Sequence, residues 1–202
     1  MKPSAGRGTQ ATTPSWIYVV DPATQRMLVV SATTRSVQET LRCGTGKRGL
    51  GFAYAQTPPG FFVMGGVRIA RNADASIQTG DTKKGVSGVY AEIVYPPTHP
   101  NPRLRGYVPN GVVIHSYNPD ASSMLRQRRS QKMIGRVPCT TGCPVPDTDE
   151  VHKLIKYLKQ SAGQFDPTSR PNANLRRLIR EGKVKIYSRR QLGDPIYILN
   201  RR

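Results

Sequence analysis

Short apolar runs rich in β-branched and aromatic residues, separated by turn residues, most constrain how this chain can fold. The 19 glycines and 17 prolines of the chain indicate a fold with many turns. The first two runs flank Asp21-Pro22-Ala23-Thr24 and predict a hairpin. In all, strands are predicted at residues 16–20, 26–30, 35–43, 61–64, 88–95, 112–115, 184–187 and 196–199. The glycine-rich residues 65–85 are predicted to be loop with short strands.

Two amphipathic helices are predicted in the C-terminal third. The first covers residues 148–160, where apolar side chains recur at helical spacing. Asp147 followed three residues later by Glu150 is typical of a capping box at its start. The second is short and ends at Gly182, a residue type common just after a helix.

The length of 202 residues fits one well-buried domain. We expect residues 1–15 to be a disordered N-terminal segment and residues 16–202 to be the folded domain. No apolar stretch is long enough to predict a membrane span, and the N-terminus lacks the apolar core of a signal peptide. A protein of this sequence that works outside the cytoplasm would have lost its signal segment or would use another export route.

A net charge of +19 predicts an anionic partner or a strongly cationic surface. Nucleic acid is the first class to consider, but the sequence has no zinc-finger spacing, RNP motif or basic heptad region. Nucleic acid is therefore not the predicted partner, and another anionic polymer such as the bacterial cell wall fits better. One interpretation that stays open is a basic binding module without catalytic activity.

One histidine and one cysteine bracket a single segment, from Gly111 to Pro146. His115 ends the apolar run Val112-Val113-Ile114, and Cys143 lies between a glycine and a proline, which predicts a tight turn. A histidine beside a thiol can take its proton and leave a reactive thiolate, which is the arrangement used in nucleophilic acyl transfer. The alternative is that both residues are structural.

Three cysteines, Cys43, Cys139 and Cys143, do not allow complete disulfide pairing within one chain. The spacing of Cys139 and Cys143 is not that of a zinc site without two further ligands, so no metal or other cofactor is predicted. Cys139 is predicted to be a bystander in its loop. Oxidation to a Cys139–Cys143 disulfide would silence a catalytic thiol.

The segment from His115 to Pro146 resembles the catalytic stretch of the L,D-transpeptidase (YkuD) family of bacterial cell-wall enzymes. That family has a strand ending in His, then a loop, then Ser/Thr-x-Gly-Cys, which is matched here by Thr140-Thr141-Gly142-Cys143. The sequence Gly142-Cys143-Pro144 is most similar to the murein branch of the family. A second landmark, Thr57-Pro58-Pro59-Gly60 followed by two phenylalanines, resembles the family's Thr-Pro-x-Gly-x-Phe strand.

The sequence departs from the family's pattern at three places. Thr141 stands where most members have His, and Val145 stands where most have Arg or Asn. Extra residues around Val137-Pro138-Cys139 separate Gly135-Arg136 from the Thr-Thr-Gly-Cys motif. These departures concern how substrate is oriented, not the nucleophile or its base.

The resemblance implies a mainly β (α+β) domain, a β-sandwich or open barrel with flanking helices. It implies that Cys143 attacks a peptidoglycan stem peptide, with His115 as the base. The remaining implied roles are oxyanion stabilisation at the turn formed by Gly142 and Thr141, and substrate binding by Arg136, Ser116 and Tyr117.

The implied activity is L,D-transpeptidase or L,D-carboxypeptidase in the bacterial cell envelope, in the periplasm or cell wall. The missing signal segment also leaves open a secreted antibacterial toxin with the same chemistry. A cationic helix at residues 120–131 is predicted between His115 and Cys143, either as a solvated face or as an anion-binding lid. The oligomeric state is not predicted.

Overall fold

The computed structural model describes most of the chain, and everything below refers to those parts. The described residues are 13–45, 57–70, 88–106, 108–109, 112–116, 133–134, 137–138, 143–147, 150–164, 173–188 and 192–200. Several sequence predictions fall outside them, including the N-terminal segment up to residue 12 and the helix expected at residues 120–131.

One sheet dominates the described residues. Nine strands form it in the order β6-β5-β4-β11-β1-β2-β3-β9, with β10 pairing with β4 as the ninth. The strands are β1 (Trp16–Asp21), β2 (Arg26–Ser31), β3 (Val37–Gly44), β4 (Gly60–Ala70), β5 (Val89–Val94), β6 (Val113–His115), β9 (Val145–Pro146), β10 (Val184–Tyr187) and β11 (Pro195–Ile198). A separate two-stranded hairpin joins β7 (Met133–Ile134) and β8 (Val137–Pro138).

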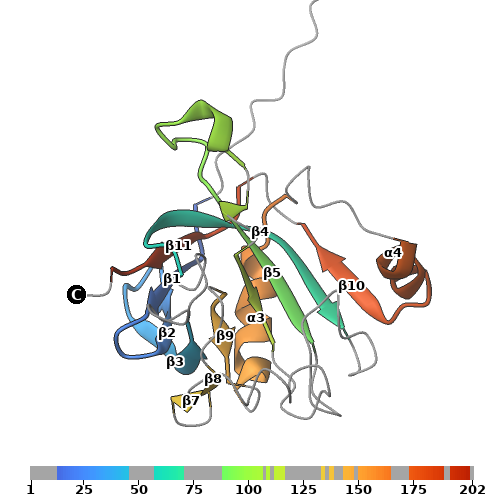
Figure 1. Cartoon of the computed structure of the whole chain (residues 1–202), viewed down its shortest axis with the longest axis horizontal. Coiled ribbons are helices and arrows are strands. Elements are labelled where there is room, and N and C mark those ends of the chain that lie inside the picture. The colour runs from blue at the N-terminus through green and yellow to red at the C-terminus, as the bar shows by residue number, and fades with distance from the viewer. Residues whose placement is uncertain are drawn as a thin grey trace, which may run out of the picture.

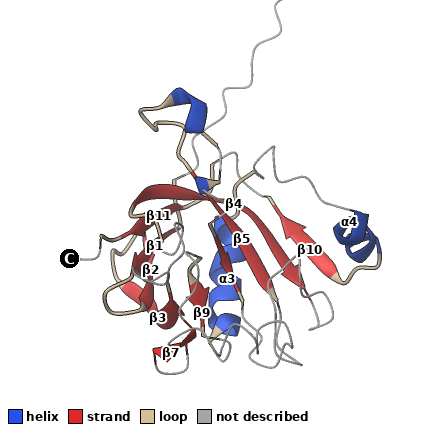
Figure 2. Ribbon diagram, viewed as in Figure 1, coloured by secondary structure: helices blue, strands red, loops and turns tan. Residues whose placement is uncertain are grey.

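The sheet curves until its two ends meet. The backbone N–H of His115, in the end strand β6, donates to the carbonyl of Pro144, just before the other end strand β9, at 3.3 Å. Neighbouring strands are antiparallel apart from β1 and β11, the first and last of the described strands, which pair in parallel. The result is a mainly β domain with a nearly closed, barrel-like sheet and few helices (Figure 2), which confirms the predicted fold class.

Helix α3 (Val151–Ser161) packs into the core on the inner side of the sheet (Figure 1). Its side chains Val151, Leu154 and Leu158 are completely buried in the core cluster, and the helix contacts β4 and β5. Burial of side chains of this size contributes on the order of 1.5–3 kcal/mol each. Among the described residues, no helix is long and apolar enough to span a membrane.

The start of α3 differs from the predicted capping box. The helix begins at Val151 after Glu150, whose side chain makes no capping hydrogen bond. Instead, the Glu150 carboxylate accepts a hydrogen bond from the backbone N–H of Arg42 at 2.7 Å. The cap is therefore replaced by a tertiary contact to β3, which local sequence does not encode.

Helix α4 (Ala173–Arg180) lies beyond β10, at the edge of the domain away from α3 (Figure 1). Its apolar residues Leu175 and Leu178 pack on Ala70 and Val184. Gly182 follows the helix with a φ of 68°, which fits the predicted role of this glycine as the end signal.

Strand β4 is longer than predicted, since it continues through Gly65 to Ala70 instead of ending in a loop. The register of β4 against β5 shifts between Met64 and Val67, which is a β-bulge. A Cβ atom at Gly65 would lie 2.7 Å from the Cβ of Glu92. Gly65 therefore allows close approach of β5 and does not break the strand.

Candidate active site

His115 and Cys143 come together where the curved sheet closes. His115 is the last residue of β6 and pairs with Tyr90 of β5. Cys143 is half-buried and directly precedes Pro144, whose carbonyl accepts the His115 N–H. The closure of the sheet thus places a thiol and an imidazole from distant parts of the sequence side by side.

The environment of the Cys143 thiol lowers its pKa below the ordinary cysteine value. Burial is the largest single influence and raises the pKa, because it disfavours the charged thiolate. A hydrogen bond with the His115 side chain, the charge of that imidazole and a backbone hydrogen bond from Val113 act the other way and prevail. Cys143 therefore has a larger fraction of thiolate, the nucleophilic form, than an ordinary cysteine at the same pH.

The orientation of His115 is set by a backbone carbonyl. Nδ1 of His115 lies 2.8 Å from the carbonyl oxygen of Ser116. A carbonyl only accepts hydrogen bonds, so Nδ1 carries the proton of the neutral ring and Nε2 is left as the basic nitrogen. An imidazole held by a third group in this way has the general arrangement of a nucleophile, a base and an orienting group.

Ser116 is completely buried at the end of this arrangement. Its hydroxyl accepts a hydrogen bond from the N–H of Val89, and its own N–H donates to the carbonyl of Val89, both at 3.0 Å. These two bonds fix the residue whose carbonyl orients His115. In the structure, Ser116 lies behind the imidazole and helps to position it. The predicted contact of Ser116 with substrate stays a prediction.

A buried ion pair, missed in the sequence, lies next to this site. Nη2 of Arg68 lies 3.3 Å from Oε1 of Glu92, and the two side chains are 5% and 0% exposed. The Arg68 guanidinium also stacks 4.6 Å from the ring centre of Tyr90, the strand partner of His115. The sequence carries a signal for this pair, namely one charged residue inside each of two apolar strands. Charged residues are rarely buried unless they are paired, so this pattern indicates an ion pair.

The other predicted site residues, Thr141, Gly142, Arg136 and Tyr117, lie outside the described residues, as does Cys139. Their roles stay predictions.

The second described thiol, Cys43, is completely buried in β3, and burial raises its pKa. Its environment disfavours the nucleophilic thiolate form, in contrast to that of Cys143. Within the described part of the chain, no group of three or more His, Cys, Asp or Glu side chains is placed to hold a metal ion.

A nearly closed β sheet that holds a cysteine beside an oriented histidine has the arrangement of nucleophile and base that acyl transfer requires. Residues 15–198 match the family model of the L,D-transpeptidase catalytic domain, YkuD. The chain therefore belongs to the YkuD family of L,D-transpeptidase catalytic domains. No curated protein matches it by sequence.

Several solved structures are similar to the chain at low identity. An L,D-transpeptidase from Mycobacterium smegmatis is 13% identical with a TM-score of 0.43, over 92% of this chain and 59% of that one. L,D-transpeptidase 1 of Mycobacterium tuberculosis is 11% identical with a TM-score of 0.41, over 92% and 62%. An L,D-transpeptidase from Stackebrandtia nassauensis is 16% identical with a TM-score of 0.41, over 98% and 62%. The chain thus spans about three-fifths of the length of these proteins.

Proposed function

We propose that this protein is a cysteine acyltransferase that acts on the stem peptides of peptidoglycan. The main support is the Cys143 thiol, whose pKa is lowered by a hydrogen-bonded imidazole that is itself oriented by the carbonyl of Ser116. Membership of the YkuD family supports the substrate class. The strong positive charge of the chain fits an anionic polymer of the cell envelope, where we propose that the protein works.

In the proposed mechanism, His115 Nε2 takes the thiol proton and the Cys143 sulfur attacks the carbonyl between an L- and a D-centred residue. Backbone N–H groups at the turn of Gly142 are the proposed donors to the oxyanion. The C–N bond then breaks, and the imidazolium gives its proton to the leaving amine. The product is a thioester on Cys143.

The second half of the reaction decides which activity is observed. An acceptor amine that attacks the thioester gives transpeptidation, and water gives carboxypeptidase activity. In both cases His115 takes a proton from the attacking group and returns it to the sulfur. One nucleophile and one base therefore serve both outcomes, and access of water to the thioester sets their ratio.

The test is mass spectrometry of tetrapeptide muropeptides after incubation with the protein, beside Cys143→Ala and His115→Ala. We expect loss of the terminal D-residue, its exchange for an added D-amino acid, or a new crosslink. Cys143→Ala should abolish these products, and His115→Ala should slow them by about 10²–10⁴-fold, the usual contribution of a general base. Muropeptides that stay unchanged while wild type and Cys143→Ala bind the cell wall equally would favour the non-catalytic binding module.

A further inference from the structure

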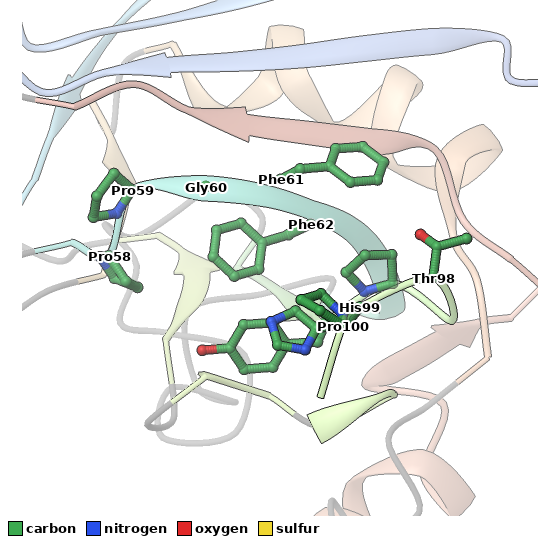
Figure 3. Close-up of a pocket in the computed structure, with 10 residues that line it drawn as sticks. Pro58, Pro59, Gly60, Phe61, Phe62, Thr98, His99 and Pro100 are labelled. Carbon is green, nitrogen blue, oxygen red and sulfur yellow. The ribbon is translucent and has the colours of Figure 1, made fainter. Parts of the chain in front are cut away.

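A pocket lies at the end of β5 opposite to the end that meets His115. Residues 58–62, at the start of β4, line one side, and five residues between 95 and 100, after β5, line the other (Figure 3). Its volume is about 310 Å³, at the lower end of the range of small-molecule sites. A single sugar ring or amino acid is a suitable occupant for this size.

Aromatic rings form a continuous row in the pocket wall. The ring centres of Phe62 and Tyr95 are 5.3 Å apart, and those of Tyr95 and His99 are 4.6 Å apart. The ring of the neighbouring Phe61 points to the other face of β4, where its centre lies 5.1 Å from that of Tyr197 (Figure 3). Phe62 is 2% exposed and forms the base of the row, so the half-buried rings of Tyr95 and His99 are the ones that a ligand can contact.

The loop that carries Tyr95 and His99 is held in place by hydrogen bonds within itself. Gly106 N–H donates to the carbonyl of Tyr95 at 2.9 Å, which closes the loop at its base. His99 N–H donates to the carbonyl of Pro96 at 2.9 Å, and Arg105 Nε donates to the carbonyl of His99 at 2.8 Å. A pocket held in this way costs little ordering entropy when a ligand binds.

The chemistry of the lining residues selects an uncharged ligand. None of the ten is Asp, Glu, Lys or Arg, although the chain as a whole has a net charge of +19. Prolines and aromatic rings present apolar faces, while Thr98 and Tyr95 supply hydroxyl groups. A pyranose ring matches this lining, because it has an apolar C–H face that packs on aromatic rings and hydroxyls at its rim.

We propose that this pocket is a subsite for an uncharged N-acetylated sugar of the peptidoglycan glycan strand. The proposal rests on the proposed function, which supplies a substrate with both peptide and sugar. Tyr90 and Tyr95 are five residues apart on and just after β5, which corresponds to about 17 Å. Three extended stem residues between the attacked carbonyl and the glycan span up to about 11 Å. The extended stem thus covers about 11 of the roughly 17 Å, and the remaining distance of about 6 Å would be covered by the sugars at and next to the branch point.

The test uses the full chain and the peptide-free tetramer of N-acetylglucosamine, with binding followed by saturation-transfer NMR. We expect saturation transfer to the sugar protons, and at least a five-fold loss of affinity in Tyr95→Ala and in His99→Ala. The matched control is Leu199→Ala, because Leu199 is 44% exposed and lies outside the pocket. This control should keep wild-type affinity. Thermal unfolding confirms that each variant is folded, and having two pocket variants keeps the test decisive if one is not.

Absence of saturation transfer, or equal affinity in all three variants, would overturn the proposal. A proline-rich peptide that binds and is lost in the pocket variants, while the sugar does not bind, would overturn it in favour of a peptide groove. Because the tetramer has no peptide, its binding does not depend on Cys143. Sugar binding without muropeptide turnover would thus count against the proposed function, and turnover without sugar binding would count against the subsite alone.

Discussion

The proposed control of Cys143 reactivity by His115 can be measured at the level of single residues. The lowered pKa of the Cys143 thiol means a larger thiolate fraction at any pH below the ordinary midpoint. We therefore expect its alkylation by iodoacetamide to rise with pH around a midpoint below that of an ordinary cysteine. His115→Ala removes the imidazole hydrogen bond and charge and leaves burial as the largest influence, so the midpoint should move above the ordinary value.

The measurement is peptide-resolved mass spectrometry, since Cys43 and Cys139 are also present. Cys43 serves as an internal control, because burial raises its pKa and should keep it unmodified in the folded protein. Identical midpoints for Cys143 in wild type and His115→Ala would show that the imidazole does not control the thiol.

At this scale the sequence predicts which residues meet but not how they are oriented. The strand ending at His115 and the turn at Cys143 are visible as an apolar run and a Gly-Cys-Pro triplet. The group that orients the imidazole is the backbone carbonyl of Ser116, and a backbone carbonyl has no sequence signature. The family resemblance implies substrate binding by Ser116, and only the structure reveals the bonds of Ser116 to Val89.

The bulge in β4 gives a prediction at the scale of the element. In Gly65→Ala, the new Cβ would meet the Cβ of Glu92 at 2.7 Å and the Cγ1 of Val94 at 3.2 Å. We expect a loss of about 1–3 kcal/mol in the free energy of unfolding, the usual cost of overpacking, measured by denaturant titration. The control Gly106→Ala has a φ of 78° but open space around its Cβ, so strain of about 1 kcal/mol is its only cost. A smaller loss for Gly65→Ala than for this control would contradict the packing argument.

The ion pair between β4 and β5 gives a second prediction at this scale. Arg68→Met or Glu92→Gln alone leaves one buried charge without its partner, which costs about 3–5 kcal/mol. The double variant removes both charges, so its loss of stability should be well below the sum of the two. A double-mutant cycle of unfolding free energies measures this coupling. Additive losses would show that the two charges do not stabilise each other.

Most elements are predictable because their residues have strong local preferences. The β-branched runs of β1, β2 and β10 and the helical spacing of α3 agree with the structure within a few residues. The errors arise where a tertiary contact overrides local signals. Glu150 bonds to Arg42 instead of capping its own helix, and the Gly65–Gly66 pair forms a bulge because Glu92 packs against it. Neither neighbour is close in sequence.

For the molecule as a whole, one buried carboxylate joins the two ends of the folded chain. Asp194, 1% exposed, accepts hydrogen bonds from the N–H groups of Ser15 and Trp16, both at 3.1 Å, and from the Ser161 hydroxyl at 2.8 Å. The Tyr18 hydroxyl meets the same serine hydroxyl at 2.7 Å. Asp194 thus links the start of β1, the end of α3 and the start of β11 by hydrogen bonds. The parallel pairing of β1 with β11 depends on contacts far apart in sequence, which explains why it was not predicted.

The substitution Asp194→Asn tests this hydrogen-bonded cluster, because it keeps the shape of the side chain. Both carboxylate oxygens of Asp194 accept hydrogen bonds, whereas an amide has only one accepting oxygen. In the variant, the NH₂ group would therefore face hydrogen-bond donors in place of the second oxygen. Buried donors without a partner cost about 1–3 kcal/mol each, so we expect a loss of about 2–4 kcal/mol. This corresponds to a fall in Tm of roughly 4–16 °C for a domain of this size.

The matched control is Asp21→Asn, because Asp21 also accepts backbone hydrogen bonds, from Ala23 and Thr24, but in an exposed turn. There water can replace a lost partner, so the change should cost at most about 1 kcal/mol. Differential scanning calorimetry of both variants decides the matter. If Asp194→Asn is no more destabilising than Asp21→Asn, the first and last strands are held together by their ladder and apolar contacts alone, and the buried carboxylate is not needed to close the fold.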